Sequence, residues 1–530
     1  MRLHTFALAG LIALGFMGAA QAADLNPTRL QLDKKGLQLL DRQGRELARY
    51  AARAKRWDQR ADGAQDHVAV LLDADRGRPV LLRSEGQVLR AQDLPEPGFA
   101  VEALCLHRDP QGLLQLFLLG EEGLSEQWLI AGPEGARPLR RLATAPGAKG
   151  CVVDDKLELL RIEEPGLGLW EHSTRVEGKP QRQLLRSTSR KAKAKAPASK
   201  TWDWPVLQPS GQTAPVARFG DAADDPAIWV HPSDARLSRI LGTNKKQGLL
   251  VYDLQGEEKQ LLEVGRINNV DLRQGLQVAP GQSMDLAVAT QRDENALLLF
   301  GIDGEGQVSE LARLPTDLKD IYGLCVGRSA EGELDAYPND KDGRVQQIRI
   351  TRSAEGRWQS RLLRQFQLAS QPEGCVVDEA NGRLFVGEEK RGIWQFDIGT
   401  GATAAKQKPQ LIMPVGGALV ADVEGLAIYR ARPGDAGYLL VSSQGNHSYL
   451  VLDAQPPYAL RGGFRVGINA ELGIDGASET DGLDVSAAHF GGVYGQGLIV
   501  VQDGHKRLPD GPQNFKLLPW SEVARALKLP

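Results

Sequence analysis

The second half of the chain is dominated by short apolar segments, each four to six residues long. They are rich in β-branched and aromatic residues, and glycine, aspartate and asparagine separate them. Such segments between turn residues are typical of β-strands. The clearest examples are residues 227–230, 248–252, 296–300, 382–386, 438–441 and 497–501. The pattern predicts an all-β fold.

A polar residue next to a glycine or another small turn opens an apolar segment at regular intervals. These residues are Asp271, Tyr322, Glu373, Glu424 and Asp481, with spacings of 51, 51, 51 and 57, and Asp225 lies 46 before Asp271. Repeats of about 40–50 residues with several short strands are typical of β-propellers. Residues 201–530 are therefore predicted to form a six-bladed β-propeller. A β-sandwich is the alternative, but it would not require equal spacing.

The N-terminus has the features of a secretory signal peptide. Arg2 precedes an apolar stretch at residues 6–17, and Ala20-Gln21-Ala22 follows as a cleavage site. We expect residues 1–22 to be removed and the protein to be exported to the periplasm or the medium. An N-terminal membrane anchor is the alternative, but the stretch is shorter than the ~20 residues that a bilayer requires. No later stretch is longer, so no membrane span is expected.

A basic segment divides the rest of the chain. Residues 182–200 contain seven lysines and arginines, no acid and few large apolar groups. Such a segment cannot bury enough surface to fold alone. We interpret residues 186–200 as a linker between a first domain, residues 23–185, and the predicted propeller. Attraction of an anionic substrate or surface is a second interpretation.

The first domain resembles a degenerate copy of part of the second. Residues 149–154, Lys-Gly-Cys-Val-Val-Asp, align with residues 373–378, Glu-Gly-Cys-Val-Val-Asp, and the segments that follow align if one residue is missing. We therefore predict an incomplete propeller of three or four blades. Because Lys149 replaces the acid, we expect this domain to be ancillary and to have no activity of its own.

Composition excludes some classes of function. A formal net charge of −3 argues against nucleic-acid binding through bulk charge.

The four cysteines, Cys105, Cys151, Cys325 and Cys375, fall at matching places in the two domains. Disulfides within each domain and buried free thiols are both compatible with this pattern.

The repeat brings acidic residues together. In a propeller the residues that open the innermost strands meet at one mouth of the central channel, so Asp225, Asp271, Tyr322, Glu373, Glu424 and Asp481 are expected to form a ring. Asp224, Glu388, Glu389 and Asp475 lie nearby in the sequence. So many carboxylates stay ionised only with cations among them, and oxygen ligands favour calcium or magnesium. A solvated acidic rim is the alternative.

Basic residues are expected at the same mouth. Lys245, Lys246, Arg292 and Lys341 follow or open strands in successive blades. Together with metal ions, they favour a ligand with several phosphates. No Cys is followed by Arg six residues on, and no Arg-His-Gly sequence or phosphate-binding G-x-x-x-x-G-K-[ST] loop occurs. This leaves direct attack on phosphorus by metal-activated water.

Nine motifs, in order along residues 212–527, resemble those of the β-propeller phytases. They are Asp224-Asp-Pro-Ala-Ile-Trp229, Thr243-Asn-Lys-Lys246, Asn268-Asn-Val-Asp271, Pro372-Glu-Gly374, Asp422-Val-Glu-Gly425, Ser442-Ser-Gln-Gly-Asn446, Glu479-Thr-Asp-Gly-Leu-Asp484, Val501-Gln-Asp-Gly504 and Asn514-Phe-Lys516. The resemblance implies a six-bladed propeller with several Ca²⁺ ions, structural and catalytic. It also implies stepwise hydrolysis of phytate, myo-inositol hexakisphosphate, and of lower inositol phosphates by a monomer.

The resemblance also implies roles for individual residues. Glu373, Glu389, Glu424, Asp475, Asp481 and Tyr322 would be catalytic, Lys245, Lys246, Arg292 and Lys341 would bind phosphate, and the metal ligands would be Asp224, Asp225, Asp271, Glu373, Glu389, Glu424, Asp475 and Asp481. The chain departs from the family where a further acid is expected, because Gln212-Thr213 stand there. This puts one calcium position in doubt.

Two other functions are compatible with a propeller of this kind. One is another calcium-centred propeller hydrolase, acting on lactones or phosphotriesters. Such a site needs few basic side chains, so the lysines and the arginine expected at this mouth disfavour it. The other is a non-catalytic binder of polyanions or of the cell envelope.

Overall fold

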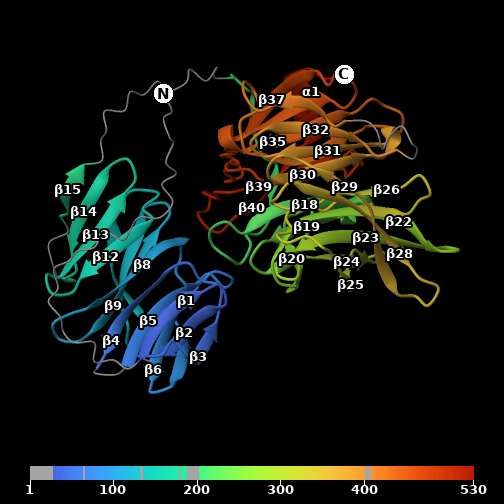
Figure 1. The fold of residues 1–530 in the computed structure, drawn as a ribbon. Helices are drawn as coiled ribbons and strands as arrows, with labels where there is room; N and C mark the ends of the chain where they lie inside the picture. The colour runs from blue at the N-terminus through green and yellow to red at the C-terminus, as the bar shows by residue number, and fades with distance from the viewer. Residues whose placement is uncertain (1–27, 64–65, 132–134, 178–180, 188–201, 400–407) are drawn as a thin grey trace, which may run out of the picture. The chain divides into compact units, whose positions relative to one another are not determined.

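The computed structural model describes residues 28–63, 66–131, 135–177, 181–187, 202–399 and 408–530. In these residues strands predominate, and α1 (Trp520–Leu527) is the one α-helix. The chain divides into two compact units (Figure 1). The first is drawn from residues up to 188, and the second from the residues that follow together with 75–77 and 97–101. The expected signal peptide and residues 188–200 of the expected linker lie outside the described residues.

The second unit contains six sheets in its described residues. Five have four strands and one has five, and every pairing is antiparallel except that of the added strand in the larger sheet. The first three sheets consist of β18 (Ala223–Trp229), β19 (Arg239–Asn244), β20 (Gly248–Asp253) and β21 (Glu258–Leu262); β22 (Ile267–Ala279), β23 (Gln282–Gln291), β24 (Ala296–Ile302) and β25 (Val308–Pro315); and β26 (Val326–Arg328), β27 (Leu334–Ala336), β28 (Arg344–Arg352) and β29 (Trp358–Gln367).

The remaining three sheets include two that are completed by strands from the beginning of the unit. They consist of β30 (Pro372–Asp378), β31 (Arg383–Glu388), β32 (Gly392–Asp397) and β33 (Gln410–Pro414); β34 (Val423–Tyr429), β35 (Tyr438–Ser443), β36 (Ser448–Asp453) and β37 (Leu460–Val466), joined by β16 (Val206–Leu207); and β38 (Leu483–Ser486), β39 (Leu498–Asp503) and β40 (Asn514–Pro519), joined by β17 (Gly211–Gln212).

The first strands of the six sheets form a closed ring. Each of β18, β22, β26, β30, β34 and β38 contacts the next, and β38 contacts β18. Apolar side chains fill the space between neighbouring sheets, with the fully buried Trp229 and Phe300 between the first two. This arrangement confirms the predicted all-β propeller.

Glycines let the inner strands approach one another closely. Tyr322, Glu373, Glu424 and Asp481 are each followed by a glycine. A Cβ on Gly374 would lie 2.3 Å from the carbonyl oxygen of Glu424, and one on Gly323 would lie 2.0 Å from that of Glu373. Because each glycine has no Cβ, it leaves free the space that the backbone of the next sheet occupies.

The first unit contains four sheets in its described residues. They consist of β1 (Thr28–Asp33), β2 (Gly36–Asp41) and β3 (Glu46–Ala51); β4 (Trp57–Asp62), β5 (Asp66–Asp73), β6 (Arg78–Glu85) and β7 (Val88–Asp93); β8 (Val101–Arg108), β9 (Leu114–Gly120), β10 (Leu124–Leu129) and β11 (Arg137–Ala143); and β12 (Gly150–Asp154), β13 (Leu159–Glu164), β14 (Gly168–Ser173) and β15 (Gln183–Ser187). Because β15 extends to Ser187, the first two residues of the expected linker belong to this strand.

Equivalent contacts recur in the two units. Disulfides join Cys105 to Cys151 and Cys325 to Cys375, which decides between the two states that the sequence left open. In the first unit Arg60 bonds Asp58 and Asp155, and in the second Arg273 bonds Asp271 and Glu379 in the same way. The two units therefore share this polar network.

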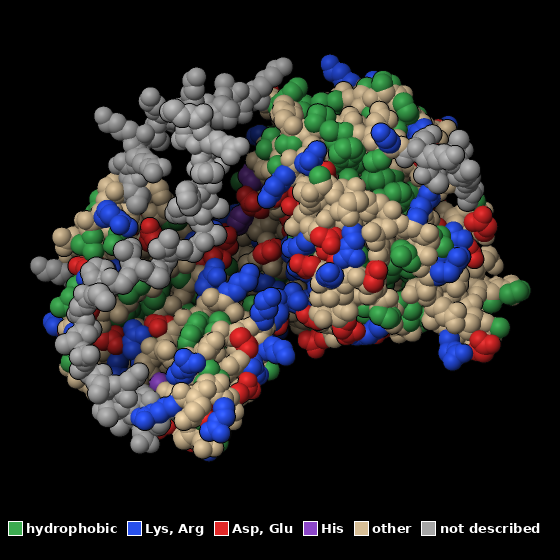
Figure 2. Space-filling view, viewed as in Figure 1, with side chains coloured by type: hydrophobic (Ala, Val, Ile, Leu, Met, Phe, Trp, Pro, Cys, Tyr) green, Lys and Arg blue, Asp and Glu red, His purple; other side chains and the backbone are tan. Residues whose placement is uncertain are grey.

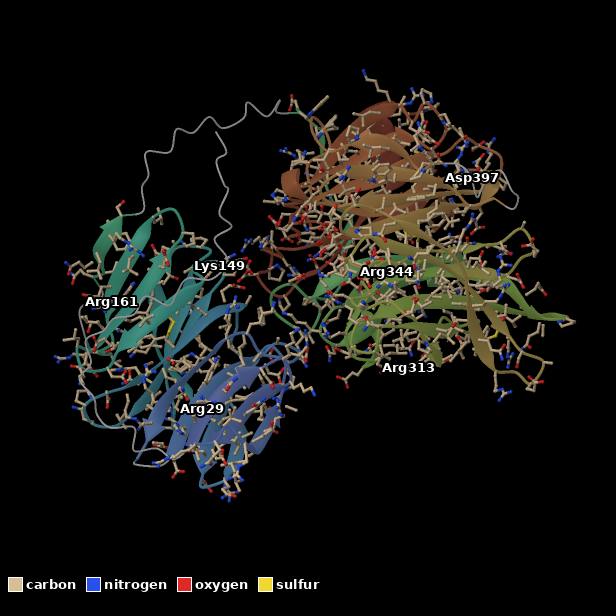
Figure 3. The ribbon with its side chains drawn as sticks, viewed as in Figure 1. Arg29, Lys149, Arg161, Arg313, Arg344 and Asp397 are labelled. Atoms are coloured by element: carbon tan, nitrogen blue, oxygen red, sulfur yellow. A yellow bond between two sulfur atoms is a disulfide. The ribbon has the colours of Figure 1, made fainter. Side chains whose placement is uncertain are left out.

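The strand register corrects one detail of the alignment between the units. Asp154 pairs with Leu159, as Asp378 pairs with Arg383, so both hairpins have the same length and no residue is missing. Glu164 therefore corresponds to Glu388, and Pro165 to Glu389. Lys149, labelled in Figure 3, lies directly before β12 in the position that Glu373 occupies in the second unit.

Replacing Gly374 by alanine should destabilise the second unit. The added Cβ would collide with backbone, which cannot move aside as the end of a side chain can. We expect the free energy of unfolding to fall by about 1–3 kcal/mol, the usual cost of overpacking, measured by denaturant unfolding. Gly304→Ala is the matched control, because nothing lies within 4 Å of its Cβ position. Equal stability of the two variants would contradict this account.

Candidate functional site

Three buried glutamates lie together in the second unit. Glu373 is in β30, Glu424 is in β34, and Glu389 follows β31 directly. Each offers a carboxylate oxygen within 4.8 Å of the others. Oε2 of Glu424 has no hydrogen-bond partner among the described residues. Burial and the charge of Glu373 raise the pKa of Glu424, and the same two causes raise the pKa of Glu389 to about 7.

Three aspartates surround a buried lysine beside these glutamates. Lys245 Nζ lies 2.9 Å from Asp481 Oδ2, 3.8 Å from Asp224 Oδ1 and 2.5 Å from Asp221 Oδ1. Burial raises the pKa of Asp481 to about 7 although Lys245 opposes the shift, and Glu373 adds to it. Burial also raises the pKa of Asp224, and the charges of Glu373 and Asp481 add to this shift. Oδ2 of Asp224 has no hydrogen-bond partner in the described chain. The charge of Glu373 therefore connects Asp224 and Asp481 electrostatically to the glutamates.

Tyr322 carries two cations on its ring. Lys341 Nζ lies 4.0 Å from the ring centroid, and the Arg292 guanidinium carbon lies 5.0 Å from it. Burial and the charge of Glu373 raise the pKa of Tyr322, so the phenol stays neutral. Burial and the charge of Arg292 lower the pKa of Lys341. Lys246 differs, because its Nζ donates to the carbonyl oxygen of Phe219 at 2.5 Å.

Asn268 links this basic group to the glutamates. Its amide nitrogen donates to Glu373 Oε1 at 2.9 Å, and its amide oxygen accepts from Arg292 at 3.1 Å. Sequence reasoning assigned no role to Asn268 or to Asp221. Both lie within three residues of assigned positions, in Asn268-Asn-Val-Asp271 and in Asp221-Ala-Ala-Asp224, and that proximity was the available signal.

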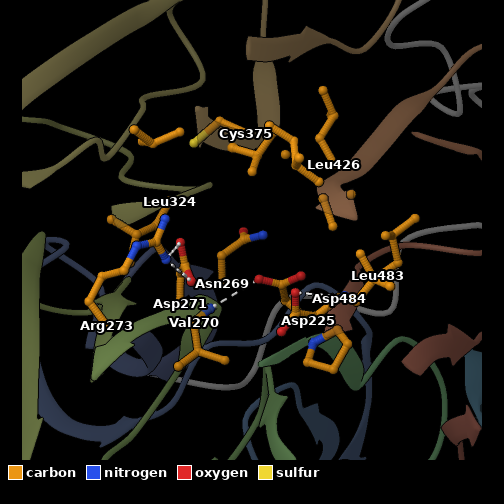
Figure 4. A pocket seen from close by; sticks show the side chains of 18 of the residues that line it. Asp225, Asn269, Val270, Asp271, Arg273, Leu324, Cys375, Leu426, Leu483 and Asp484 are labelled. Atoms are coloured by element: carbon orange, nitrogen blue, oxygen red, sulfur yellow. Dashed lines mark hydrogen bonds and ion pairs between the residues drawn. The ribbon is translucent and has the colours of Figure 1, made fainter. Parts of the chain in front are cut away.

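Asp225 and Asp271 line a cavity inside the ring of inner strands (Figure 4). The cavity has a volume of about 240 Å³ and is also bordered by Arg273 and Asp484. Asp225 accepts the N–H of Val270, Asp271 that of Val326, and Asp484 that of Ile228. Each of these aspartates thus joins its strand to the neighbouring inner strand. The structure does not place Asp225 or Asp271 among the clustered glutamates.

Asp475 and Glu388 have other partners. Asp475 Oδ1 lies 2.7 Å from Lys516 Nζ, and its second oxygen accepts the N–H of Arg507. Glu388 accepts from Ser370 Oγ at 2.6 Å and from Trp394 Nε1 at 2.7 Å. Both side chains therefore take part in contacts that hold the fold.

The mouth cluster, Asp224, Glu373, Glu389, Glu424 and Asp481, suits a hard cation. It offers only oxygen ligands, and two of its buried oxygens, on Asp224 and Glu424, lack any hydrogen-bond partner in the described residues. An orphaned buried carboxylate oxygen costs free energy unless an ion or a proton satisfies it. Oxygen donors of this kind favour calcium or magnesium over zinc or copper.

A family model described as Phytase matches residues 181–529. The chain belongs to the phytase family. It is therefore a phosphoric monoester hydrolase, and the resemblance noted in the sequence is confirmed. A curated 3-phytase of Bacillus subtilis (strain 168) is 38% identical over 328 residues, which cover 60% of this chain and 84% of that protein.

Solved structures that resemble this phytase family member are distant from it. A functionally unknown protein of Desulfotomaculum acetoxidans aligns over 74% of this chain and 94% of its own, with 8% identity and a TM-score of 0.30. The β-propeller domain of Myceliophteria thermophila Cps50 aligns over 70% and 96%, with 13% identity and a TM-score of 0.34.

The buried Asp484 should make metal-free stability depend on pH. Burial and the charge of Asp271 raise its pKa from 3.8 to about 7. Between these values the folded chain keeps a proton that the unfolded chain releases. The free energy of unfolding should therefore fall as pH rises from 4 to 7, by up to about 1.4 kcal/mol per unit for this group. Denaturant unfolding of Asp484→Asn with a chelator should show a shallower slope than wild type.

The exposed Asp203→Asn provides the control, since it should keep the wild-type slope. If Asp484→Asn and Asp203→Asn gave the same pH dependence, Asp484 would not hold a proton in the folded chain.

Proposed function

We propose that the chain is an exported, calcium-dependent 3-phytase. In this proposal water attacks a phosphate monoester of phytate directly, and lower inositol phosphates follow as substrates. The observation that carries the proposal is the group of buried carboxylates with orphaned oxygens, bordered by Lys245, Arg292 and Lys341. Family membership and the similarity to the Bacillus subtilis 3-phytase support it.

Ca²⁺ at the mouth cluster would neutralise these carboxylates, attract phosphate oxygens and lower the pKa of a bound water. We assign its binding to Asp224, Glu373, Glu389, Glu424 and Asp481. Glu389, which follows β31 beside Glu373 and Glu424, is the member to which we assign acceptance of a proton from the attacking water.

Phosphate groups would be held by the basic side chains. Arg292 and Lys341 both contact the ring of Tyr322, at 5.0 and 4.0 Å from its centroid. Charge-assisted bonds from them to phosphate oxygens are stronger than neutral ones. Asn268 fixes Arg292 relative to Glu373. Two phosphates on adjacent ring carbons could then be bound together, one near the carboxylates and one near the cations.

We assign an ancillary role to the first unit. Lys149 and Pro165 stand in the positions of Glu373 and Glu389, so two of the proposed metal ligands are missing there.

Export agrees with the two disulfides. No helix in the described residues is long and apolar enough to cross a membrane. We expect the protein to act as a monomer. In the second unit, charges of both signs are mixed on the visible face (Figure 2).

Phosphate release from phytate, with and without a calcium chelator, tests the proposal. Wild type should release phosphate with Ca²⁺ and lose this activity with chelator. Glu424→Gln should reduce kcat by about 100-fold or more, the usual cost of losing an electrostatic contact at a reacting centre, while the fold survives. Glu305→Gln, on an exposed turn, is the control. A polyanion binder would release no phosphate, and a phosphotriesterase would leave phytate intact.

Removing Lys341, one of the two cations that contact the Tyr322 ring, should lower catalytic efficiency without loss of bound metal. Lys341→Met should lower kcat/KM for phytate by about 10-fold or more, since a charge-assisted bond contributes about 1.5–3 kcal/mol. The bound calcium, counted by equilibrium dialysis, should stay as in wild type. Lys319→Met, on the surface, should change neither value. An unchanged kcat/KM in Lys341→Met would remove Lys341 from the phosphate site.

A further inference from the structure

A fully buried lysine lies among four side-chain oxygens in the last sheet of the second unit. Lys516, in β40, has no exposed surface. Its Nζ lies 2.7 Å from Asp475 Oδ1, 2.9 Å from Asn514 Oδ1, 3.0 Å from Gln212 Oε1 and 3.0 Å from Asp503 Oδ2. The contacts to Asp475, Asn514 and Gln212 are hydrogen bonds and use the three N–H groups of the ammonium. Asp503 Oδ2 contacts Lys516 as an ion pair and has no hydrogen-bond partner in the described residues.

The oxygens come from separate segments and are themselves held in place. Gln212 is in β17, Asp503 ends β39, and Asp475 precedes β38. Oδ1 of Asp503 accepts the N–H groups of Ser478 and His505, both at 3.1 Å. Asn514 Nδ2 donates to Gln212 Oε1 at 3.0 Å. The group is therefore a preorganised oxygen cage with a cation at its centre.

Charge supports the same interpretation. The cage supplies two carboxylates, Asp475 and Asp503, and Gln212 adds a neutral oxygen where the family pattern led us to expect an acid. Lys506 is also buried, and its charge acts on the same two aspartates. Two buried negative charges thus face two buried positive ones, and the third aspartate that acts on Lys506, Asp510, is exposed. A third carboxylate would have left an excess that favours a divalent ion.

We propose that Lys516 is the resident cation of this cage, and that the cage binds no metal in the native chain. The ammonium group then does what a structural calcium ion would do. It ties β17 from the start of the unit to β39, β40 and the Asp475 loop, and so closes the ring of sheets. Asp475 acts through this cage as a positioning residue and is neither a catalytic group nor a calcium ligand, which revises the expectation drawn from the sequence.

Counting tightly bound calcium in full-length variants tests this directly. Wild type, Lys516→Met and Asp503→Asn would be dialysed against trace Ca²⁺, and the ions per chain measured. Lys516→Met keeps a similar length but removes the charge, so it should bind one more Ca²⁺ than wild type. Asp503→Asn should bind the same number as wild type. The exposed Lys528→Met is the control and should also match wild type.

Thermal unfolding provides a second readout that does not depend on activity. In chelator, Lys516→Met should unfold at a lower temperature than wild type, because two carboxylates lose their buried counter-charge. Ca²⁺ should raise the Tm of Lys516→Met by more than it raises that of wild type.

Two results would overturn the proposal. If Asp503→Asn bound one Ca²⁺ fewer than wild type, a metal ion and not Lys516 would occupy the native cage. If Lys516→Met folded but bound no additional ion and gained no more from Ca²⁺ than wild type, the cage would not be a cation site. Should Lys516→Met fail to fold, the count for Asp503→Asn still decides whether the native cage holds metal.

Discussion

The close approach of the inner strands is the constraint on which the rest of the second unit depends. Gly374 and Gly425 each follow a glutamate, and each leaves room for the backbone of the next sheet. The same geometry forces the preceding side chains toward one another at the end of the channel. Carboxylates separated by some fifty residues in the sequence are therefore brought within a few ångströms, and their mutual repulsion cannot be relieved by moving apart.

The structure deals with this repulsion differently in different places. In the mouth cluster, pKa values are raised and oxygens are left without partners, so the charge is not balanced by the protein alone. Inside the channel, burial also raises the pKa values of Asp225, Asp271 and Asp484, but each accepts a backbone N–H group from a neighbouring strand. Around Lys516 the counter-charge is built into the chain. In the mouth cluster, Asp224 and Glu424 thus keep buried oxygens that neither a backbone N–H group nor a side chain satisfies.

The propeller fold and two of the clustered glutamates were predictable from sequence, because both follow from the spacing of the repeat. The period of about fifty residues and the short strands correctly predicted an all-β propeller, and the acid–glycine pairs identified Glu373 and Glu424. The direction of a side chain was harder to predict. Asp224 and Asp225 are adjacent, and adjacent residues of a strand point to opposite faces, so one joins Lys245 while the other faces the channel. Sequence alone also could not separate Asp475 from the glutamates, because its partner Lys516 is 41 residues away.

The pairing of β17 with β40, and of β16 with β37, has a consequence for how such chains evolve. β17 and β40 pair within one sheet and β16 joins the neighbouring sheet, so strands from the start of the unit complete its last two sheets. A module closed in this way presents its entry and exit at one place and can be joined to another copy without rebuilding its interior. Additional chain can then be joined before β16 while the paired strands that close the ring stay as they are.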